Sequence, residues 1–217
     1  MDLVPVLLVP GWGDHAPANL SPMRDRLVGA GWPESRVSAL AFEDPVGSNE
    51  AHALEIARAV QILQSLTGED RVDVVAHSMG GLAVRQYIQF EGGHENVRRA
   101  VFLGTPHRGT VAAILAWGEG GRQMAPGSEF LNRLNDGDGF PEQVEALALR
   151  TPVDLRVIPG SSAMLPGAWN VEVCCPTHNG LVDDERVFTE VRHFLLHGAE
   201  GVEGSDDSIP LRTDWSR

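Results

Sequence analysis

Short apolar blocks alternate with amphipathic segments of helical period along most of the chain. Residues 4–9 form a continuous apolar run that ends at Pro10, a pattern typical of a strand buried on both faces of a parallel sheet. Similar blocks predict five further strands, at residues 36–42, 72–76, 97–103, 155–159 and 171–175. Helical patterns lie between them at residues 21–29, 49–67 and 80–90, and another follows the last strand at 183–197. The alternation predicts an α/β fold with a mostly parallel, six-stranded sheet flanked by helices.

This alternation is interrupted after the fourth predicted strand. Residues 105–150 contain two helix-like pieces, at 111–117 and 129–135, separated by glycine-rich joints. Because the insertion begins on the carboxyl side of a strand, where parallel sheets build ligand sites, we expect a helical cap or lid. Simple packing of its helices on the sheet is the open alternative. Residues 1–198 are predicted to form a single domain, and residues 199–217 an acidic, loosely ordered tail.

The charge balance excludes some classes of partner. The chain has 217 residues, 17 of them basic and 30 acidic, and a formal net charge of −13. Binding to nucleic acid or to anionic lipid needs a basic face, so neither partner is expected. No apolar run approaches the roughly 20 residues of a membrane span, and no stable membrane anchor is expected. The first residues lack the features of a signal peptide, which favours the cytoplasm for the sequence as given and secretion if a leader precedes it.

The cysteines and histidines do not indicate a metal centre. Cys174 and Cys175 are adjacent in a predicted strand, where their side chains would point to opposite faces. Neither a disulfide framework nor a cysteine metal site is therefore expected. No pair of histidines has the spacing of metal ligands, so we predict no metal and no cofactor. The oligomeric state stays open.

The junction between a predicted strand and a predicted helix at residues 72–81 carries the sharpest signal, Val-Asp-Val-Val-Ala-His-Ser-Met-Gly-Gly. A nucleophilic serine at such a junction needs a strained backbone, and small residues two positions before and after it let strand and helix approach closely. Ala76 and Gly80 are those small residues around Ser78. The arrangement predicts Ser78 as the nucleophile of an acyl-transfer site. The alternative is a buried serine in an ordinary turn.

Acyl transfer also needs N–H donors for the oxyanion and a base for the serine proton. The expected donors are the backbone N–H of Met79, which follows the serine, and that of Trp12, in the loop after the first strand. A plain glycine turn is the alternative for that loop. Among eight histidines, His178 alone lies between the last predicted strand and the final helix, where the base is expected.

Three blocks of the chain resemble the small Bacillus-type lipases and carboxylesterases of the α/β-hydrolase superfamily. They are the run from Pro5 to Gly81, which contains the strand-to-helix elbow Ala-His-Ser-Met-Gly at 76–80, the run Phe-Leu-Gly-Thr-Pro-His-Arg-Gly-Thr at 102–110 and the run His-Asn-Gly-Leu at 178–181. The resemblance implies a serine hydrolase with Ser78 as nucleophile, His178 as base, and Trp12 and Met79 as oxyanion donors. The expected substrates are small-molecule or lipid esters, cleaved through an acyl-enzyme. An apolar acyl group is expected because the insertion carries an apolar patch, formed by Ala112, Ile114, Leu115, Ala116 and Trp117.

The chain departs from this family in two places. Pro10 stands where the family usually has a histidine before the oxyanion glycine. No carboxylate follows the strand predicted at 155–159, where the triad acid is expected, and the acid is therefore left unassigned. Either the acid is relocated, or Ser161 or Ser162 orients His178 in a weaker dyad. The candidates for a relocated acid are Glu43, Asp44, an acid in 105–150, and Asp183 or Asp184, although caps of the last helix are the favoured interpretation of these two.

Two rival hypotheses remain. One keeps the site but changes the substrate to a polyester, phospholipid, thioester or amide. The other, motivated by the missing acid, is a non-catalytic hydrolase-like binding module, which predicts no turnover of any activated ester.

Overall fold

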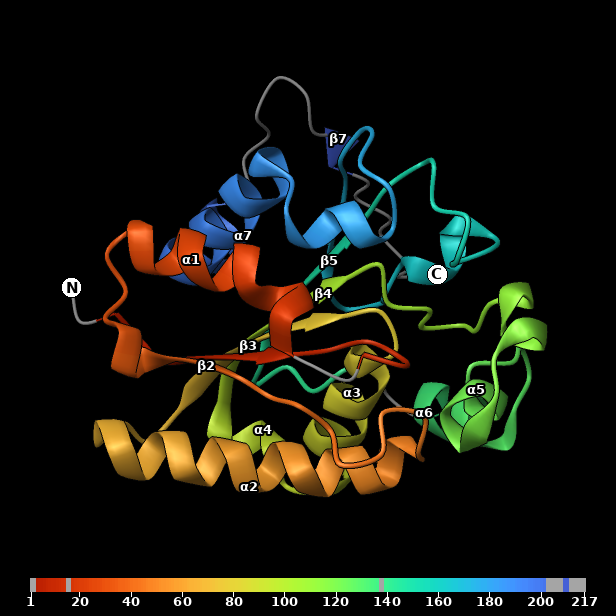
Figure 1. The fold of residues 1–217 in the computed structure, drawn as a ribbon, viewed down its shortest axis with the longest axis horizontal. Helices are drawn as coiled ribbons and strands as arrows, with labels where there is room; N and C mark the ends of the chain where they lie inside the picture. Colours follow the sequence, from red (N-terminus) through yellow and green to blue (C-terminus); the bar gives the residue numbers. More distant parts are fainter. Residues whose placement is uncertain (1–2, 15–16, 137–138, 202–208, 211–217) are drawn as a thin grey trace.

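The computed structural model describes residues 3–14, 17–136, 139–201 and 209–210. Its strands form one sheet in the order β2-β1-β3-β4-β5-β6-β7 (Figure 1). The parallel strands are β1 (Val6–Val9), β2 (Val37–Ala39), β3 (Val72–His77), β4 (Val97–Leu103), β5 (Glu145–Arg150) and β6 (Trp169–Glu172). The short β7 (Ile209–Pro210) pairs antiparallel with β6. The predicted α/β architecture with six parallel strands is therefore confirmed.

Helices connect the strands. The α-helices are α1 (Ser21–Gly29), α2 (Asn49–Thr67), α3 (Gly80–Phe90), α4 (Gly93–Asn96), α5 (Gly118–Gln123), α6 (Glu129–Asn135) and α7 (Glu185–His197). The 3-10 helices are η1 (Pro17–Leu20), η2 (Glu34–Arg36), η3 (Val111–Leu115), η4 (Gly160–Ala163), η5 (Asn179–Val182) and η6 (Gly198–Gly201). Within the described ranges, none of these helices is long and apolar enough to cross a membrane.

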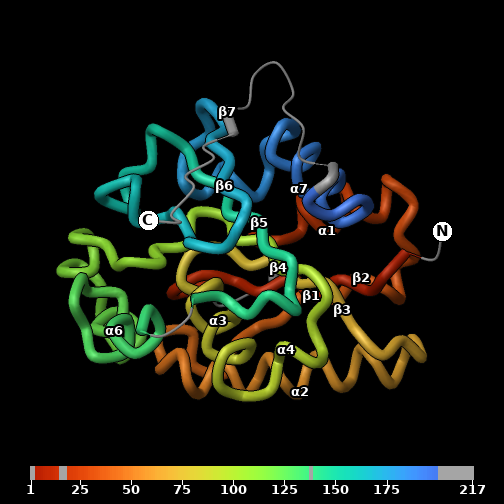
Figure 2. The backbone as a smooth tube through the Cα atoms, turned by 180° about the vertical axis from the view of Figure 1, so that it is seen from behind, coloured from red at the N-terminus to blue at the C-terminus, as the bar shows by residue number. Residues whose placement is uncertain are grey.

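Two hydrophobic layers hold the helices to the sheet. Helices α2 and α3 lie on one face and α1 and α7 on the other, as the front and back views both show (Figures 1 and 2). The alternation along β1 explains this division, because Leu7 and Val9 pack toward α2 and α3 while Val6 and Leu8 pack toward α1 and α7. Helices α5 and α6 lie beside the carboxyl ends of the strands (Figure 1).

The prediction of a strand at 155–159 is wrong. The fifth strand is β5 at Glu145–Arg150, inside the range that the sequence assigned to the insertion. The prediction failed because Glu-Ala-Leu-Ala-Leu-Arg is rich in good helix formers, whereas Leu-Arg-Val-Ile at 155–158 has the composition of a strand. In the structure 155–158 is a loop, because the carboxylate of Asp154 accepts hydrogen bonds from the N–H groups of Arg156 and Val157.

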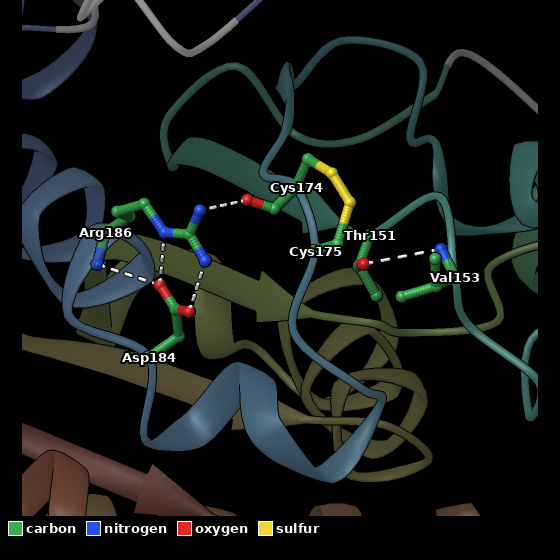
Figure 3. The surroundings of a disulfide bond; sticks show 6 residues. All are labelled: Thr151, Val153, Cys174, Cys175, Asp184 and Arg186. Carbon is green, nitrogen blue, oxygen red and sulfur yellow. Dashed lines mark hydrogen bonds and ion pairs between the residues drawn. A yellow bond between two sulfur atoms is a disulfide. The ribbon is translucent and has the colours of Figure 1, made fainter.

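The expectation that Cys174 and Cys175 lie in a strand and form no disulfide is also wrong. Strand β6 ends at Glu172, so Cys174 and Cys175 lie in the exposed loop that follows it, and their sulfur atoms are bonded to each other (Figure 3). Figure 3 also shows Arg186, near the start of α7, donating a hydrogen bond to the carbonyl of Cys174 while it pairs with Asp184. This arrangement joins the loop after β6 to the last helix.

Other boundaries also differ from the predictions. Strand β2 is only Val37–Ala39, preceded by η2, where residues 36–42 were expected. The piece expected as a helix at 111–117 is a 3-10 helix that ends at Leu115. Of the expected acidic tail, η6 and β7 are described, and residues 202–208 and 211–217 lie outside the described residues. The division into a domain at 1–198 and a tail stays a prediction.

Candidate active site

Ser78 lies at the sharp turn between β3 and α3, at the carboxyl edge of the sheet. Its φ of 54° makes it the only residue other than glycine with a positive φ among the described residues. This left-handed conformation is costly for a residue with a side chain and persists where the surrounding structure holds it. The Ser78 N–H donates to the carbonyl of Leu103 at 2.8 Å. A Cβ at Gly80 would collide with the carbonyl oxygen of Pro10, which explains the small residue two positions after the serine.

His178 brings the loop after β6 to this serine. Its Nε2 lies 2.9 Å from the Oγ of Ser78, so the hydroxyl can donate its proton to the ring. The side chain of His178 is only 5% exposed. Room for the ring is made by Gly104, because a Cβ there would lie 3.1 Å from Nδ1. The glycine in the block at 102–110 is thus a site residue whose role the sequence did not show.

Asp154 supplies the carboxylate that the sequence analysis failed to find. The Nδ1–H of His178 donates to its Oδ2 at 2.7 Å, and the Asp154 side chain is 3% exposed. The other oxygen, Oδ1, accepts from the backbone N–H groups of Arg156 at 2.8 Å and Val157 at 2.9 Å. One oxygen therefore holds the imidazole and the other holds the loop.

The charge of Asp154 is set by two opposing effects. Burial raises the pKa of its carboxyl, but the hydrogen bond and charge of His178 and the N–H groups of Val157 and Arg156 outweigh it, so the pKa lies below its ordinary value. The carboxylate is therefore ionised under the conditions in which His178 must be neutral to accept a proton. An ionised partner also fixes the tautomer of His178 with its proton on Nδ1.

The correct strand assignment explains the missed acid. Asp154 follows β5, the penultimate parallel strand, by four residues, which is where the resemblance noted in the sequence leads one to expect a triad acid. The expectation that no acid stands in that place is wrong, because it was applied to a strand at 155–159 that does not exist. The signal was present in the sequence, since Thr-Pro-Val-Asp follows the apolar residues 146–149 after a single arginine.

The other acid candidates lie elsewhere in the molecule. Asp184 is the N-cap of α7 and accepts from the N–H groups of Arg186 and Val187, as expected for a capping residue. Asp183 forms an ion pair with Arg26 at 3.7 Å, and Glu43 and Asp44 are exposed in the loop after β2. The serines proposed for a dyad lie in η4, and the hydrogen bond of His178 goes to Asp154 instead.

The expected oxyanion donors flank Ser78. Met79 begins the turn into α3, and the loop after β1 brings Gly11 so close that a Cβ there would lie 3.1 Å from the Cβ of Ser78. The N–H groups of Met79 and Trp12 have no hydrogen-bond acceptor among the described residues. The Trp12 ring donates from Nε1 to the carbonyl of Trp117 at 3.1 Å, which joins this loop to the segment after η3. Within the same described residues, no group of three or more His, Cys, Asp or Glu side chains is placed to hold a metal ion.

Ser78 lines a largely apolar pocket of about 220 Å³. One wall is formed by η3 and the next residues, and another by the loop after Asp154. Hydrogen bonds join the two walls, because the Thr110 hydroxyl donates to the carbonyl of Arg156 at 2.7 Å and Val111 N–H donates to Ile158 at 3.0 Å. Seven large apolar side chains on η3, the residues after it and the loop after β5 are exposed, and we call them the apolar rim: Val111, Ile114, Leu115, Trp117, Val153, Leu155 and Ile158.

A sequence profile for the family described as Lipase (class 2) matches residues 3–173. The chain belongs to the class 2 lipase family. The matched range includes Ser78 and Asp154 and ends before His178.

Solved structures agree with this assignment at the level of fold. Aspergillus fumigatus lipase B matches with a TM-score of 0.76 and 18% identity over 89% of this chain, which spans 52% of that protein. The mature Bacillus licheniformis lipase BlEst2 matches with a TM-score of 0.75 and 16% identity over 88% of this chain and 91% of its own. A pyrethroid hydrolase from Sphingobium faniae matches with a TM-score of 0.61 and 16% identity, over 91% of this chain and 99% of its own. The α/β-hydrolase fold is therefore confirmed, whereas this chain spans only about half the length of the Aspergillus lipase.

Proposed function

We propose that this class 2 lipase family member is a serine carboxylic-ester hydrolase that cleaves esters with apolar acyl groups through an acyl-enzyme. The observation that carries the proposal is the continuous chain of hydrogen bonds from Ser78 through His178 to Asp154. Ser78, the first residue of this hydrogen-bonded chain, lines an apolar pocket. A nucleophile, a base within hydrogen-bond reach and a third group that orients the base are what acyl transfer requires.

The first half of the proposed reaction forms the acyl-enzyme. The Oγ of Ser78 attacks the carbonyl carbon of the ester as its proton moves to Nε2 of His178. The ionised Asp154 stabilises the imidazolium that results. The N–H groups of Met79 and Trp12 stabilise the oxyanion, and the C–O bond to the alcohol then breaks as Nε2 returns the proton to the leaving oxygen.

The second half releases the acid by the same groups in the reverse direction. Water gives a proton to Nε2 of His178 and its oxygen attacks the acyl carbon. The collapse of the second tetrahedral intermediate breaks the bond to Ser78, and the proton on Nε2 returns to the serine oxygen. The net change is ester plus water to acid plus alcohol, with no cofactor consumed.

The apolar rim supports an apolar acyl group as the preferred substrate. Leu115 and Leu155 both line the pocket that contains Ser78, and both side chains are 81% exposed. An apolar chain that covers them removes their surface from water, which favours binding by about 25 cal/mol for each Å² covered. The substrate alternatives, a polyester, phospholipid, thioester or amide, use the same site and stay open at this level. The binding-module hypothesis loses its motivation, since it rested on a missing acid.

Hydrolysis of 4-nitrophenyl esters from acetate to palmitate, together with an emulsified triacylglycerol, tests this proposal. We expect turnover that is lost in Ser78→Ala and retained in Ser161→Ala, a change at an exposed serine of η4 that serves as the matched control. The ratio of rates on dissolved short esters and on emulsified long ones separates an esterase from a lipase. Equal activity in Ser78→Ala, or no turnover of any activated ester by folded protein, would contradict the proposal.

A further inference from the structure

His77 is a buried histidine at the end of β3, next to the nucleophile, and the proposed reaction does not use it. Its residue exposure is 6%. The sequence analysis gave it no role. A histidine buried in a core usually needs a hydrogen-bond partner, and the partner of His77 identifies its role.

That partner is the main chain of the proposed base. The Nε2–H of His77 donates to the backbone carbonyl of His178 at 3.1 Å, and the two ring centroids lie 4.8 Å apart. Because the acceptor is a main-chain oxygen, the bond holds the loop that carries His178 and leaves both nitrogens of the His178 ring free for Ser78 and Asp154.

The other side of the His77 ring faces the loop that carries Trp12. A Cβ at Gly11 would lie 3.3 Å from Nδ1 of His77, so the glycine allows this loop to pack on the ring. The imidazole is therefore part of the strand that ends at Ser78, bonds to the loop of His178 and leaves room beside it only for a glycine in the loop of the proposed oxyanion donor.

We propose that His77 is a positioning residue, which fastens the loop of His178 to the strand of Ser78 and so sets the distance between base and nucleophile. The inference rests on the proposed function. Burial, reinforced by the charge of His178, lowers the pKa of His77 to about 3, which agrees with a neutral ring that keeps one N–H donor and does not compete for the serine proton.

Amide replacements of two lengths separate positioning from packing. In His77→Gln the amide nitrogen has a reach similar to that of Nε2, whereas in His77→Asn the amide is too short to reach the carbonyl of His178. Misplacing a catalytic group by about 1 Å costs on the order of 100-fold in rate. We expect kcat on a 4-nitrophenyl ester to fall about 10- to 100-fold in His77→Asn with KM changed less than about threefold, and to stay within about threefold of wild type in His77→Gln.

A proton NMR measurement supplies a readout that a merely structural role would not change. The Nδ1–H of His178, bonded to Asp154, is expected to give a sharp low-field resonance in wild type and in His77→Gln and a broadened or absent one in His77→Asn. His77→Leu, of similar volume without a donor, is the second variant that should lose the resonance, and melting temperatures verify folding.

Two results would overturn the proposal: wild-type kcat and resonance in folded His77→Asn or His77→Leu, or equal losses of kcat in the Gln and Asn variants with the resonance retained in both. Failure of this proposal can be told apart from failure of the ester-hydrolase proposal. If wild type cleaves no ester, that proposal fails, while the resonance still reports whether His77 positions His178.

Discussion

At the scale of single residues, the two carboxylate oxygens of Asp154 accept hydrogen bonds from different partners. Oδ2 accepts from His178, while Oδ1 accepts from two backbone N–H groups of the loop that also forms a wall of the pocket. The acid is thereby held in place independently of the histidine. A residue that binds both its loop and its partner is sensitive to changes that preserve shape but alter hydrogen bonding.

Asp154→Asn tests this division directly. The amide keeps the volume and can still accept from the loop, but it is neutral and does not stabilise the His178 cation or enforce its tautomer. By comparison with serine-protease triads we expect kcat to fall by a factor on the order of 10³ to 10⁴. Steady-state kinetics on a 4-nitrophenyl ester, with the melting temperature as a check of folding, measures the effect.

Asp184→Ala is the matched control for the acid. Asp184 caps α7, and the hydrogen bond and charge of Arg186 hold the pKa of its carboxyl below the usual value. Its loss is expected to lower the free energy of unfolding by about 1 kcal/mol and to leave kcat unchanged. A large loss of kcat in Asp184→Ala together with a small one in Asp154→Asn would reverse the assignment.

At the scale of elements, β3, the serine turn and α3 were predictable and β5 was not. The residues of β3 are apolar except for Asp73 and His77 and end at a turn with strict steric demands, so sequence alone placed Ser78 at this turn. The Glu, Ala, Leu and Arg residues of β5 are good helix formers, and the strand forms because β4 and β6 pair with it on both sides. That pairing connects residues far apart in sequence, and the position of Asp154 depended on it.

The apolar rim gives a prediction at this scale. Leu115→Ser and Leu155→Ser remove exposed side chains that line the pocket on η3 and on the loop after β5. Because both side chains are already 81% exposed, the free energy of unfolding should change by less than about 0.5 kcal/mol. We expect kcat/KM to fall about three- to tenfold for a long-chain ester and to stay unchanged for the acetate, since each leucine offers a fraction of its transfer energy to the acyl chain.

The control for the rim lies on another part of the surface. Leu66 on α2 is 76% exposed and does not line the pocket. Leu66→Ser should therefore leave the chain-length profile as in wild type. A loss of long-chain activity in Leu66→Ser equal to that in Leu115→Ser would show that general surface hydrophobicity, and not the rim, binds the acyl chain.

At the scale of the whole molecule, the carboxyl and amino ends of the parallel strands have different roles. The carboxyl edge carries the proposed reaction, whereas near the amino edge Arg98 pairs with the buried Asp73, and both Arg98 and Arg99 donate to the carbonyl of Leu195 at the end of α7. Those bonds attach the last helix to the central strands. Buried titratable groups near both faces make stability depend on pH.

Two buried histidines contribute to that dependence between about pH 6.5 and about pH 5. Burial is the main cause that lowers the pKa of His77, which faces His178, Asp154 and Arg156, and the pKa of His107, which faces Arg85. Both are neutral when folded but take up a proton on unfolding below a pKa of about 6.5. The unfolded state therefore binds more protons there, and stability is lost as pH falls from about 6.5 toward 5.

Urea unfolding at several pH values measures this effect. Each histidine is expected to contribute up to about 1.4 kcal/mol per pH unit. His107→Gln should reduce the slope between pH 6.5 and 5 by about one proton, and His193→Gln, a change at an exposed position of α7, should keep the wild-type slope. A wild-type stability that rises as pH falls through this range would contradict the assignment.

The central claim is that Ser78 is the nucleophile activated by His178 and Asp154. A reactive phosphonate ester followed by intact-protein and peptide mass spectrometry tests it most directly. We predict one phosphonyl group per chain, located on Ser78, with loss of esterase activity in proportion to labelling and much slower labelling in Asp154→Asn. Labelling that persists in Ser78→Ala, or full inhibition with Ser78 unmodified, would contradict the account.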